Sequence, residues 1–196
     1  MNSIIVRAMQ RLGIALAALL LLPFSVAAQT RPLMTEPATT APAGRIVLES
    51  AFDVMSSEPN FLTGEPRDVW AGPLLRLVYS PADPVELDVE WVARVGARDD
   101  PDFGTVSDFG DVSLRAKVRF VDREGFDLGA RFGVTLPQTS FGNGLGPNTL
   151  RMSAQMLATG RVGPVALHAN GGLALYDEAL RPHEQRDFLA YGLALE

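Results

Sequence analysis

The stretch VELDVEWVARV (residues 85–95) alternates apolar and polar side chains with one interruption. Its apolar alternate positions are Val85, Leu87, Val89, Trp91, Ala93 and Val95, and its charged positions are Glu86, Asp88, Glu90 and Arg94. Successive side chains of a β-strand point to opposite faces, whereas a helix repeats about every 3.6 residues. The stretch therefore predicts a strand with one apolar face and one charged face.

Two later stretches repeat this separation of charge, DVSLRAKVRF (residues 111–120) and FDLGARFGVTL (residues 126–136). All ten charged residues of the three stretches fall on one face of their strands. A shift of one residue would exchange the two faces, so the pattern fixes the pairing register. Together with one arginine of a weaker strand, they are expected to face a polar interior: Glu86, Asp88, Glu90, Arg94, Asp111, Arg115, Lys117, Arg119, Asp127, Arg131 and Arg151.

Weaker alternation predicts five more strands at residues 45–54, 68–79, 149–159, 164–175 and 187–196, which makes about eight in this chain. The connections alternate between short ones (80–84, 122–125, 160–163) and long ones (55–67, 96–109, 137–148, 176–186). A strand of about 11 residues tilted by about 45° is roughly 25 Å tall, which is the height of the apolar band of outer-membrane barrels. The chain is therefore predicted to be an all-β, antiparallel, up-and-down transmembrane β-barrel, complete or part of a larger barrel.

Three aromatic residues, Tyr79, Phe120 and Phe126, fall on the apolar face beside the short connections. Aromatic rings favour the boundary between lipid and water, so they are expected to form a girdle at the periplasmic rim. Only a closed barrel satisfies strand backbones in lipid. If eight strands are all there is, the strand near Ile46 must pair with the one near Phe188.

The first segment has the order of a secretory signal peptide. Arg7 and Arg11 precede an uncharged run that ends in small residues, and residues 1–28 are expected to be removed after Ala27 or Ala28. Residues 29–44 are rich in Pro, Thr and Ala without periodicity, and they predict a flexible leader. The barrel domain is expected to span residues 45–196, located in the outer membrane of a Gram-negative type of envelope.

Composition narrows the function classes. The net charge of −6 argues against a nucleic-acid partner. The absence of cysteine excludes thiolate nucleophiles and thiolate metal sites. His168 and Asn170 share the polar face of one strand, but no serine accompanies them there. The sequence predicts no enzyme, no metal site and no cofactor.

Two segments resemble the outer-membrane barrels of the MetA-pathway of phenol degradation family. They are FGDVSLRAKVRF (residues 109–120), which is similar to the family's Gly-Asp-opened strand, and GVTLP (residues 133–137) followed by the Gly-rich loop FGNGLG (residues 141–146). Pro137-Gln138-Thr139 stands where the family often has Pro-Thr-Gly. Family members are also generally longer, which leaves two expectations open: a complete small barrel, or a fragment of a larger one. The resemblance implies transport of small aromatic or hydrophobic molecules and carries over no catalytic residues.

Three functions remain open at this stage. The first is a passive outer-membrane pore or transporter, whose partners are membrane lipid and small hydrophobic or aromatic solutes. The second is a small closed barrel that serves a structural or adhesive role through its long loops, because eight strands leave an interior that side chains can fill. The third is a soluble secreted β-protein, whose apolar face would be its interior.

Overall fold

The computed structural model describes residues 35–181 and 184–196, which form one antiparallel sheet. Its strands are β1 (Ile46–Pro59), β2 (Pro66–Ala82), β3 (Val85–Val92), β4 (Val95–Asp100), β5 (Gly104–Asp108), β6 (Val112–Arg123), β7 (Phe126–Leu136), β8 (Arg151–Val162), β9 (Val165–Asp177) and β10 (Gln185–Leu195). A short 3₁₀ helix, η1 (Phe141–Asn143), lies between β7 and β8. The predicted signal peptide and residues 29–34 lie outside the described residues.

The strand order is β10-β9-β8-β7-β6-β3-β2-β4-β5, and β1 pairs with the other edge of β2. The long strand β2 pairs with β3 along one half, from Leu74 to Ala82, and with β4 along the other, from Asp68 to Ala71. In chain order, β3 with β4 and β5 with β6 therefore make two long interrupted strands. Eight long strands result, and the prediction of an all-β antiparallel architecture is confirmed.

Residues 96–109 differ from the sequence prediction, which made them a long loop. They form most of the β4–β5 hairpin, in which Gly96 pairs with Ser107 and Ala97 with Val106. Ala97 is fully buried and packs in a small apolar cluster with Val69, Ala71 and Val95. Burial of this short apolar run against β2 makes the segment a hairpin, although its tip is acidic.

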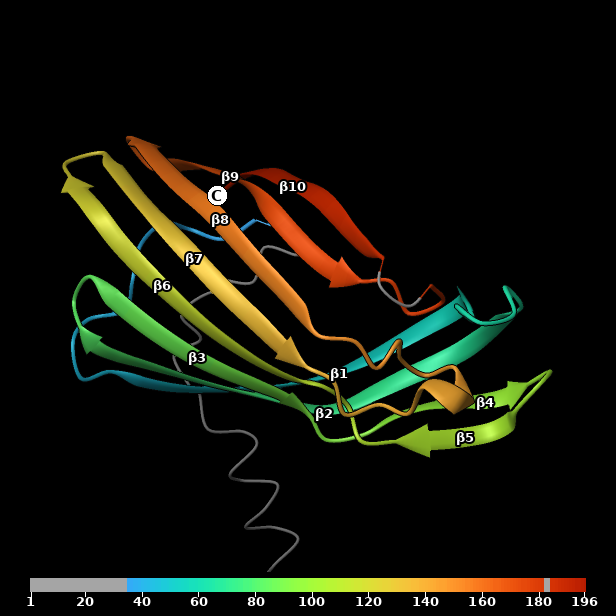
Figure 1. The fold of residues 1–196 in the computed structure, drawn as a ribbon. Coiled ribbons are helices and arrows are strands. Elements are labelled where there is room, and N and C mark those ends of the chain that lie inside the picture. Colours follow the sequence, from blue (N-terminus) through green and yellow to red (C-terminus); the bar gives the residue numbers. More distant parts are fainter. Residues whose placement is uncertain (1–34, 182–183) are drawn as a thin grey trace, which may run out of the picture. The chain divides into compact units, whose positions relative to one another are not determined.

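The sheet curls into a half-barrel in which β6 to β10 rise on one side and β1 and β2 lie on the other (Figure 1). Among the described residues β1 pairs only with β2, and β10 pairs only with β9. The outer edges of β1 and β10 are therefore free among the described residues, and the expected pairing of the first strand with the last is absent from this structure.

The three predicted short connections are confirmed, whereas one of the four predicted long ones, residues 96–109, is mostly the β4–β5 hairpin. Two-residue turns follow β2, β6 and β8 at residues 83–84, 124–125 and 163–164. Gly125 and Gly163 adopt positive φ angles of 77° and 60° there, as tight hairpin turns require. The long connections gather at the opposite end of the strands.

The apolar face of the sheet is exposed and the polar face is covered. Leu77, Leu87, Phe132 and Leu173 are each more than two-fifths exposed, whereas Asp127 on the opposite face is 1% exposed. A soluble sandwich has the reverse arrangement. No helix of the described residues is long and apolar enough to cross a membrane.

Candidate functional site: the polar trough

The concave face of the half-barrel forms a trough, named here the polar trough, whose side chains come from β2, β3, β6, β7, β8 and β9. Ten of the eleven charged residues expected at a polar interior contribute to it or to its mouth. Their ion pairs include Lys117–Glu86 at 3.1 Å, Arg115–Glu90 at 2.5 Å, Arg119–Asp127 at 3.4 Å and Arg151–Asp111 at 2.5 Å. Alternation along each strand brings these side chains to one face, and strand pairing brings them together.

Asp88 lies at the centre of this network. Its carboxylate is 3.1 Å from Arg76 of β2, 3.5 Å from Arg115 of β6 and 3.8 Å from Arg131 of β7. Asp88 is only 6% exposed, so its charge depends on these partners rather than on water. The trough is therefore a lattice of paired charges and not a strip of one sign.

Residues 35–44 differ from the flexible leader that the sequence predicts. They lie against the polar trough, seen as the blue trace behind the strands in Figure 1, and Ala38 is fully buried. The carboxylate of Glu36 lies 3.2 Å from Lys117 and also pairs with Arg131. A segment without periodicity is ordered here because the trough offers partners to its charge and its backbone.

Sequence reasoning missed several members of the trough, among them Glu36 and Arg76. These two had a usable signal, because Glu36 is the only charged residue from 32 to 44 and Arg76 is the only one from 69 to 82. A single charge in an otherwise uncharged stretch of a two-faced sheet indicates a fixed partner on the polar face.

Arg94 is the exception among the predicted interior residues. It lies in the irregular step between β3 and β4, it is exposed, and its guanidinium lies 4.9 Å from the centre of the Phe109 ring. The step shifts the alternation by one residue, so that Val92 and Val95 line the same cavity. A simple period of two places Arg94 on the wrong face.

The three residues of the predicted aromatic girdle lie on the exposed apolar face. Tyr79 is 43%, Phe120 53% and Phe126 43% exposed. All three are near the two-residue turns of β2–β3 and β6–β7. Their position at one end of the apolar face matches the expected geometry, and their role stays a prediction.

A buried ion pair ties the long connection after β7 to the opposite strands. Arg67 Nη1 donates to Asp100 Oδ2 at 2.8 Å, and Arg67 also donates to the carbonyl oxygen of Gly144. Gly144 has a φ of 69°, and a Cβ there would lie 2.6 Å from Asn60 Oδ1, so this position requires glycine. Residues 137–150, named here the mouth loop, are thus fastened across the end of the trough.

Burial acts to raise the pKa of Asp100, but hydrogen bonds outweigh it. The donors are Arg67 and the backbone N–H groups of Asp102 and Phe103, both at 2.9 Å. The pKa of Asp100 is therefore below its ordinary value. The carboxylate stays charged and holds the hairpin tip and Arg67 together.

Two further carboxylates, those of Asp108 and Asp111, anchor the start of the mouth loop. Asp108 accepts the backbone N–H of Ser140 at 2.8 Å, and this bond is the largest cause of its lowered pKa. The hydroxyl of Thr139 is 2.8 Å from Asp111 Oδ1, and the other oxygen of Asp111 accepts from Arg151. Strand ends and loop are joined by charge-assisted hydrogen bonds, which are stronger than neutral ones.

Two cavities lie beside the mouth loop. One of about 440 Å³ has a polar lining that includes Glu90, Arg115 and Arg151. The other, of about 480 Å³, is more apolar and includes Phe61 and Phe188. Both are lined by Leu145, Gly146 and Pro147, so the mouth loop separates a polar inner cavity from an aromatic outer one.

His168 lies between two oxygen-bearing groups on the polar face. Its Nδ1 is 2.9 Å from Thr159 Oγ1 and its Nε2 is 3.2 Å from Glu196 Oε2. The order of hydroxyl, imidazole and carboxylate is that of a hydrolase triad. Thr159, however, is fully buried and its oxygen already accepts the N–H of Ala38 at 2.9 Å, so a substrate carbonyl has no approach to it.

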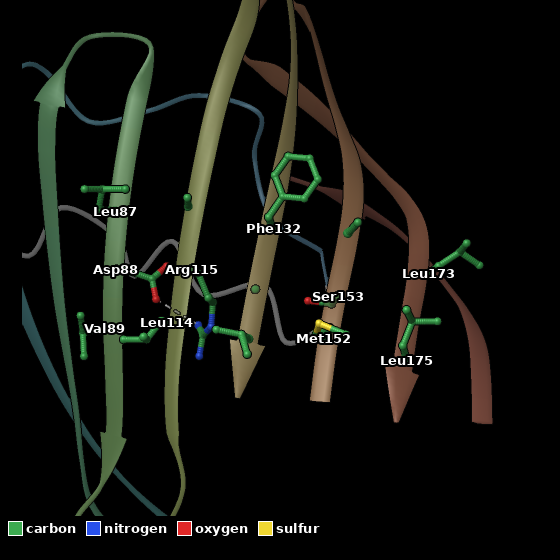
Figure 2. A pocket seen from close by; sticks show the side chains of 14 residues that line it. Leu87, Asp88, Val89, Leu114, Arg115, Phe132, Met152, Ser153, Leu173 and Leu175 are labelled. Atoms are coloured by element: carbon green, nitrogen blue, oxygen red, sulfur yellow. Dashed lines mark ion pairs between the residues drawn. The ribbon is translucent and has the colours of Figure 1, made fainter. Parts of the chain in front are cut away.

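A shallow groove of about 670 Å³ crosses the apolar face over β3, β6, β7, β8 and β9 (Figure 2). Its lining combines small residues, Ala116 and Ala154, with large ones such as Leu87, Phe132 and Met152. Figure 2 also draws the ion pair of Asp88 with Arg115, which belongs to the polar trough. The groove offers apolar contact without a polar group to select a ligand.

No group of three or more His, Cys, Asp or Glu side chains suited to a metal ion occurs in residues 35–181 and 184–196. No protein-family model, curated protein or solved structure matches this chain. The resemblance to the MetA-pathway family therefore remains a prediction from the sequence, and the function rests on geometry alone.

Proposed function

We propose that this chain forms the wall of an outer-membrane β-barrel and that the polar trough is a passive path for small solutes. The observation that carries the proposal is the polarity of the two faces. The side chains that a soluble protein would cover are exposed, and the charged ones are covered. Lipid is the solvent that makes this arrangement stable, because exposed contiguous apolar surface of this extent is rare in soluble monomers.

The end of the apolar face nearest the long connections supports the same proposal. Beyond the irregular steps in β2 and between β3 and β4, charged side chains appear on the outer face, and apolar side chains join the buried Arg67–Asp100 pair on the inner face. Val69 and Ala97 are buried on the inner face beneath Leu145, while Asp68 and Arg98 are exposed on the outer face. This is the change expected where strands leave lipid and enter water.

An aromatic pair marks this same level. Phe52 and Trp70 stack with ring centres 6.2 Å apart and their planes at 2°. They stand at the opposite end of the apolar face from Tyr79, Phe120 and Phe126. Two aromatic levels with an apolar band between them are the pattern of a membrane barrel with two interfaces.

The mouth suggests where an aromatic or hydrophobic solute would first bind. Tyr176 and Phe188 lie with ring centres 5.0 Å apart in the lining of the outer cavity, next to Phe61. Such rings bind apolar and aromatic molecules by burial and by ring contacts. The charged trough below selects by polarity.

Conductance in a planar bilayer tests the pore. We expect discrete conductance steps from the purified protein, and we expect Arg115→Glu to shift its ion selectivity toward cations. The matched control is Arg123→Glu, because Arg123 is exposed beside a two-residue turn, outside the trough. Neither conductance nor solute flux in liposomes would contradict the proposal.

A closed structural or adhesive barrel is the second candidate, and one observation favours it. The trough is filled by ion pairs and by residues 35–44, as an interior without a path would be. Replacing the mouth loop and the β4–β5 hairpin with short turns should then abolish binding of cells to a surface. Unchanged binding of cells to the surface, together with bilayer conductance, would exclude the adhesive role and favour the pore.

A further inference from the structure

Residues 36–41 lie in the polar trough in the manner of a bound peptide. The carboxamide of Asn170 accepts the N–H of Glu36 at 2.6 Å and donates to its carbonyl oxygen at 2.9 Å, in the orientation that satisfies both bonds. The N–H of Ala38 donates to Thr159 at 2.9 Å, and that of Ala41 donates to Glu86 at 3.2 Å. Side chains of three strands thus bind the main chain of this segment.

The side chain of Glu36 is held by cations from three further strands. Its carboxylate is 3.2 Å from Lys117 of β6, pairs with Arg131 of β7 and is 4.0 Å from Arg76 of β2. The side chain is 16% exposed, so the site is largely desolvated. Converging cations in such a site favour a carboxylate over an uncharged group.

The neighbouring acidic residues could not take over the role of Glu36 as the closest carboxylate partner of Arg131. Without Glu36, Lys117 would still have Glu86 at 3.1 Å, but the remaining carboxylate near Arg131 would be that of Asp88, which lies 3.8 Å away. Removal of Glu36 would therefore leave Arg131 without its closest partner. A largely covered cation in that position gains from any carboxylate that can reach it.

We propose that the polar trough contains a binding site for small organic carboxylates, especially those joined to an amide, and that Glu36 occupies it in this structure. The proposal rests on the proposed function, because the site would lie on the path of the solute. Arg131, Lys117 and Arg76 would bind the carboxylate, and Asn170 would bind the amide. Glu36 is a competitor tethered to the site at high effective concentration.

The test is equilibrium binding of two matched ligands to the folded protein in detergent, measured by titration calorimetry. The ligands are glutamate and glutamine, each with an N-acetyl group and a C-terminal methylamide. We expect Glu36→Gln to bind the glutamate derivative at least about tenfold more tightly than the unmodified protein. The glutamine derivative should gain nothing. Glu65→Gln, which changes an exposed residue of the β1–β2 connection, should match the unmodified protein.

Two further variants separate the site from a general loosening. Thr159→Val removes the anchor of Ala38 and leaves the cations in place, so it should also raise the affinity. Adding Arg131→Met to Glu36→Gln should cancel the gain. The site would be overturned if neither Glu36→Gln nor Thr159→Val raised the affinity for the glutamate derivative. It would also be overturned if the affinity for the two ligands rose equally. Binding of the glutamate derivative without bilayer conductance would support the site and would contradict only the proposed pore.

Discussion

At the scale of single residues, two neighbouring glycines of β9 have opposite surroundings. A Cβ on Gly172, which faces the trough, would lie 2.1 Å from the carbonyl oxygen of Ala154. A Cβ on Gly171, on the apolar face, would have no atom within 4 Å. The obstacle at Gly172 is backbone of the paired strand, so it cannot rotate away as a side chain would.

We therefore expect Gly172→Ala to lower the free energy of unfolding by about 1–3 kcal/mol, because β8 and β9 must shift apart. Gly171→Ala is the matched control and should change it by less than about 0.5 kcal/mol. Urea unfolding of the refolded protein in lipid or detergent measures both. Equal midpoints for the two variants would show that the spacing of β8 and β9 is not fixed at this point.

At the scale of elements, the mouth loop behaves as part of the sheet because acidic residues at strand ends bind its backbone. Asp108 is one of these anchors, with Ser140, Phe109 and Asn143 as donors and Arg94 as a nearby cation. Its pKa is lowered from an ordinary value of 3.8. A lowered pKa in the folded state means that the charged form is the one that stabilises the loop.

The anchoring by Asp108 should thus be complete above pH 3.8 and lost as the pH falls through the lowered folded-state pKa. Hydrogen exchange of residues 137–150, corrected for the intrinsic rate at each pH, measures it. Asp108→Asn should expose these amides already at neutral pH. Asp122→Asn, whose side chain is 67% exposed beside a two-residue turn, should retain the pH dependence of the unmodified protein. Protection that is the same in Asp108→Asn and the unmodified protein would exclude this anchor.

At the scale of the whole described sheet, the free edges of β1 and β10 decide how a barrel is completed. In a membrane, as proposed, the edge backbone groups of β1 and β10 would need partners, and one register of antiparallel pairing between these strands brings Leu48 near Leu193. Both side chains are on the exposed apolar face, at 72% and 75%. The chain contains no cysteine, so an engineered pair gives an unambiguous crosslink.

We expect Leu48→Cys with Leu193→Cys to form a disulfide within one chain after insertion into a bilayer. Leu48→Cys with Leu87→Cys is the control, because β2 separates β1 from β3 and no crosslink should form. Gel mobility before and after reduction distinguishes the products. A product of twice the mass would instead place the closing strand in a second chain, and no crosslink in any neighbouring register would exclude direct β1–β10 pairing.

Much of this architecture could be predicted from the sequence because charge and apolarity alternate with the strand period. The eight long strands, the positions of the short turns and ten of the interior charges follow from that alternation alone. Arg94 was misplaced because an irregular step shifts the alternation by one residue, which a local pattern does not reveal. The binding of residues 36–41 was missed because it depends on contacts with β2, β3 and β6 to β9, which are far away in the sequence.

The charged side chains that appear on the outer face beyond the irregular steps of β2 and β3–β4 have a consequence for protein engineering. The apolar band ends at these steps, so the β4–β5 hairpin can change length without altering how deeply the remaining strands would be seated. If the chain lies in a membrane as proposed, a foreign peptide inserted between Phe103 and the exposed Gly104 would leave the donors of the buried Asp100 in place and would be displayed clear of the lipid. Under the proposed function, the hairpin tip is thus a site for an affinity tag or an epitope.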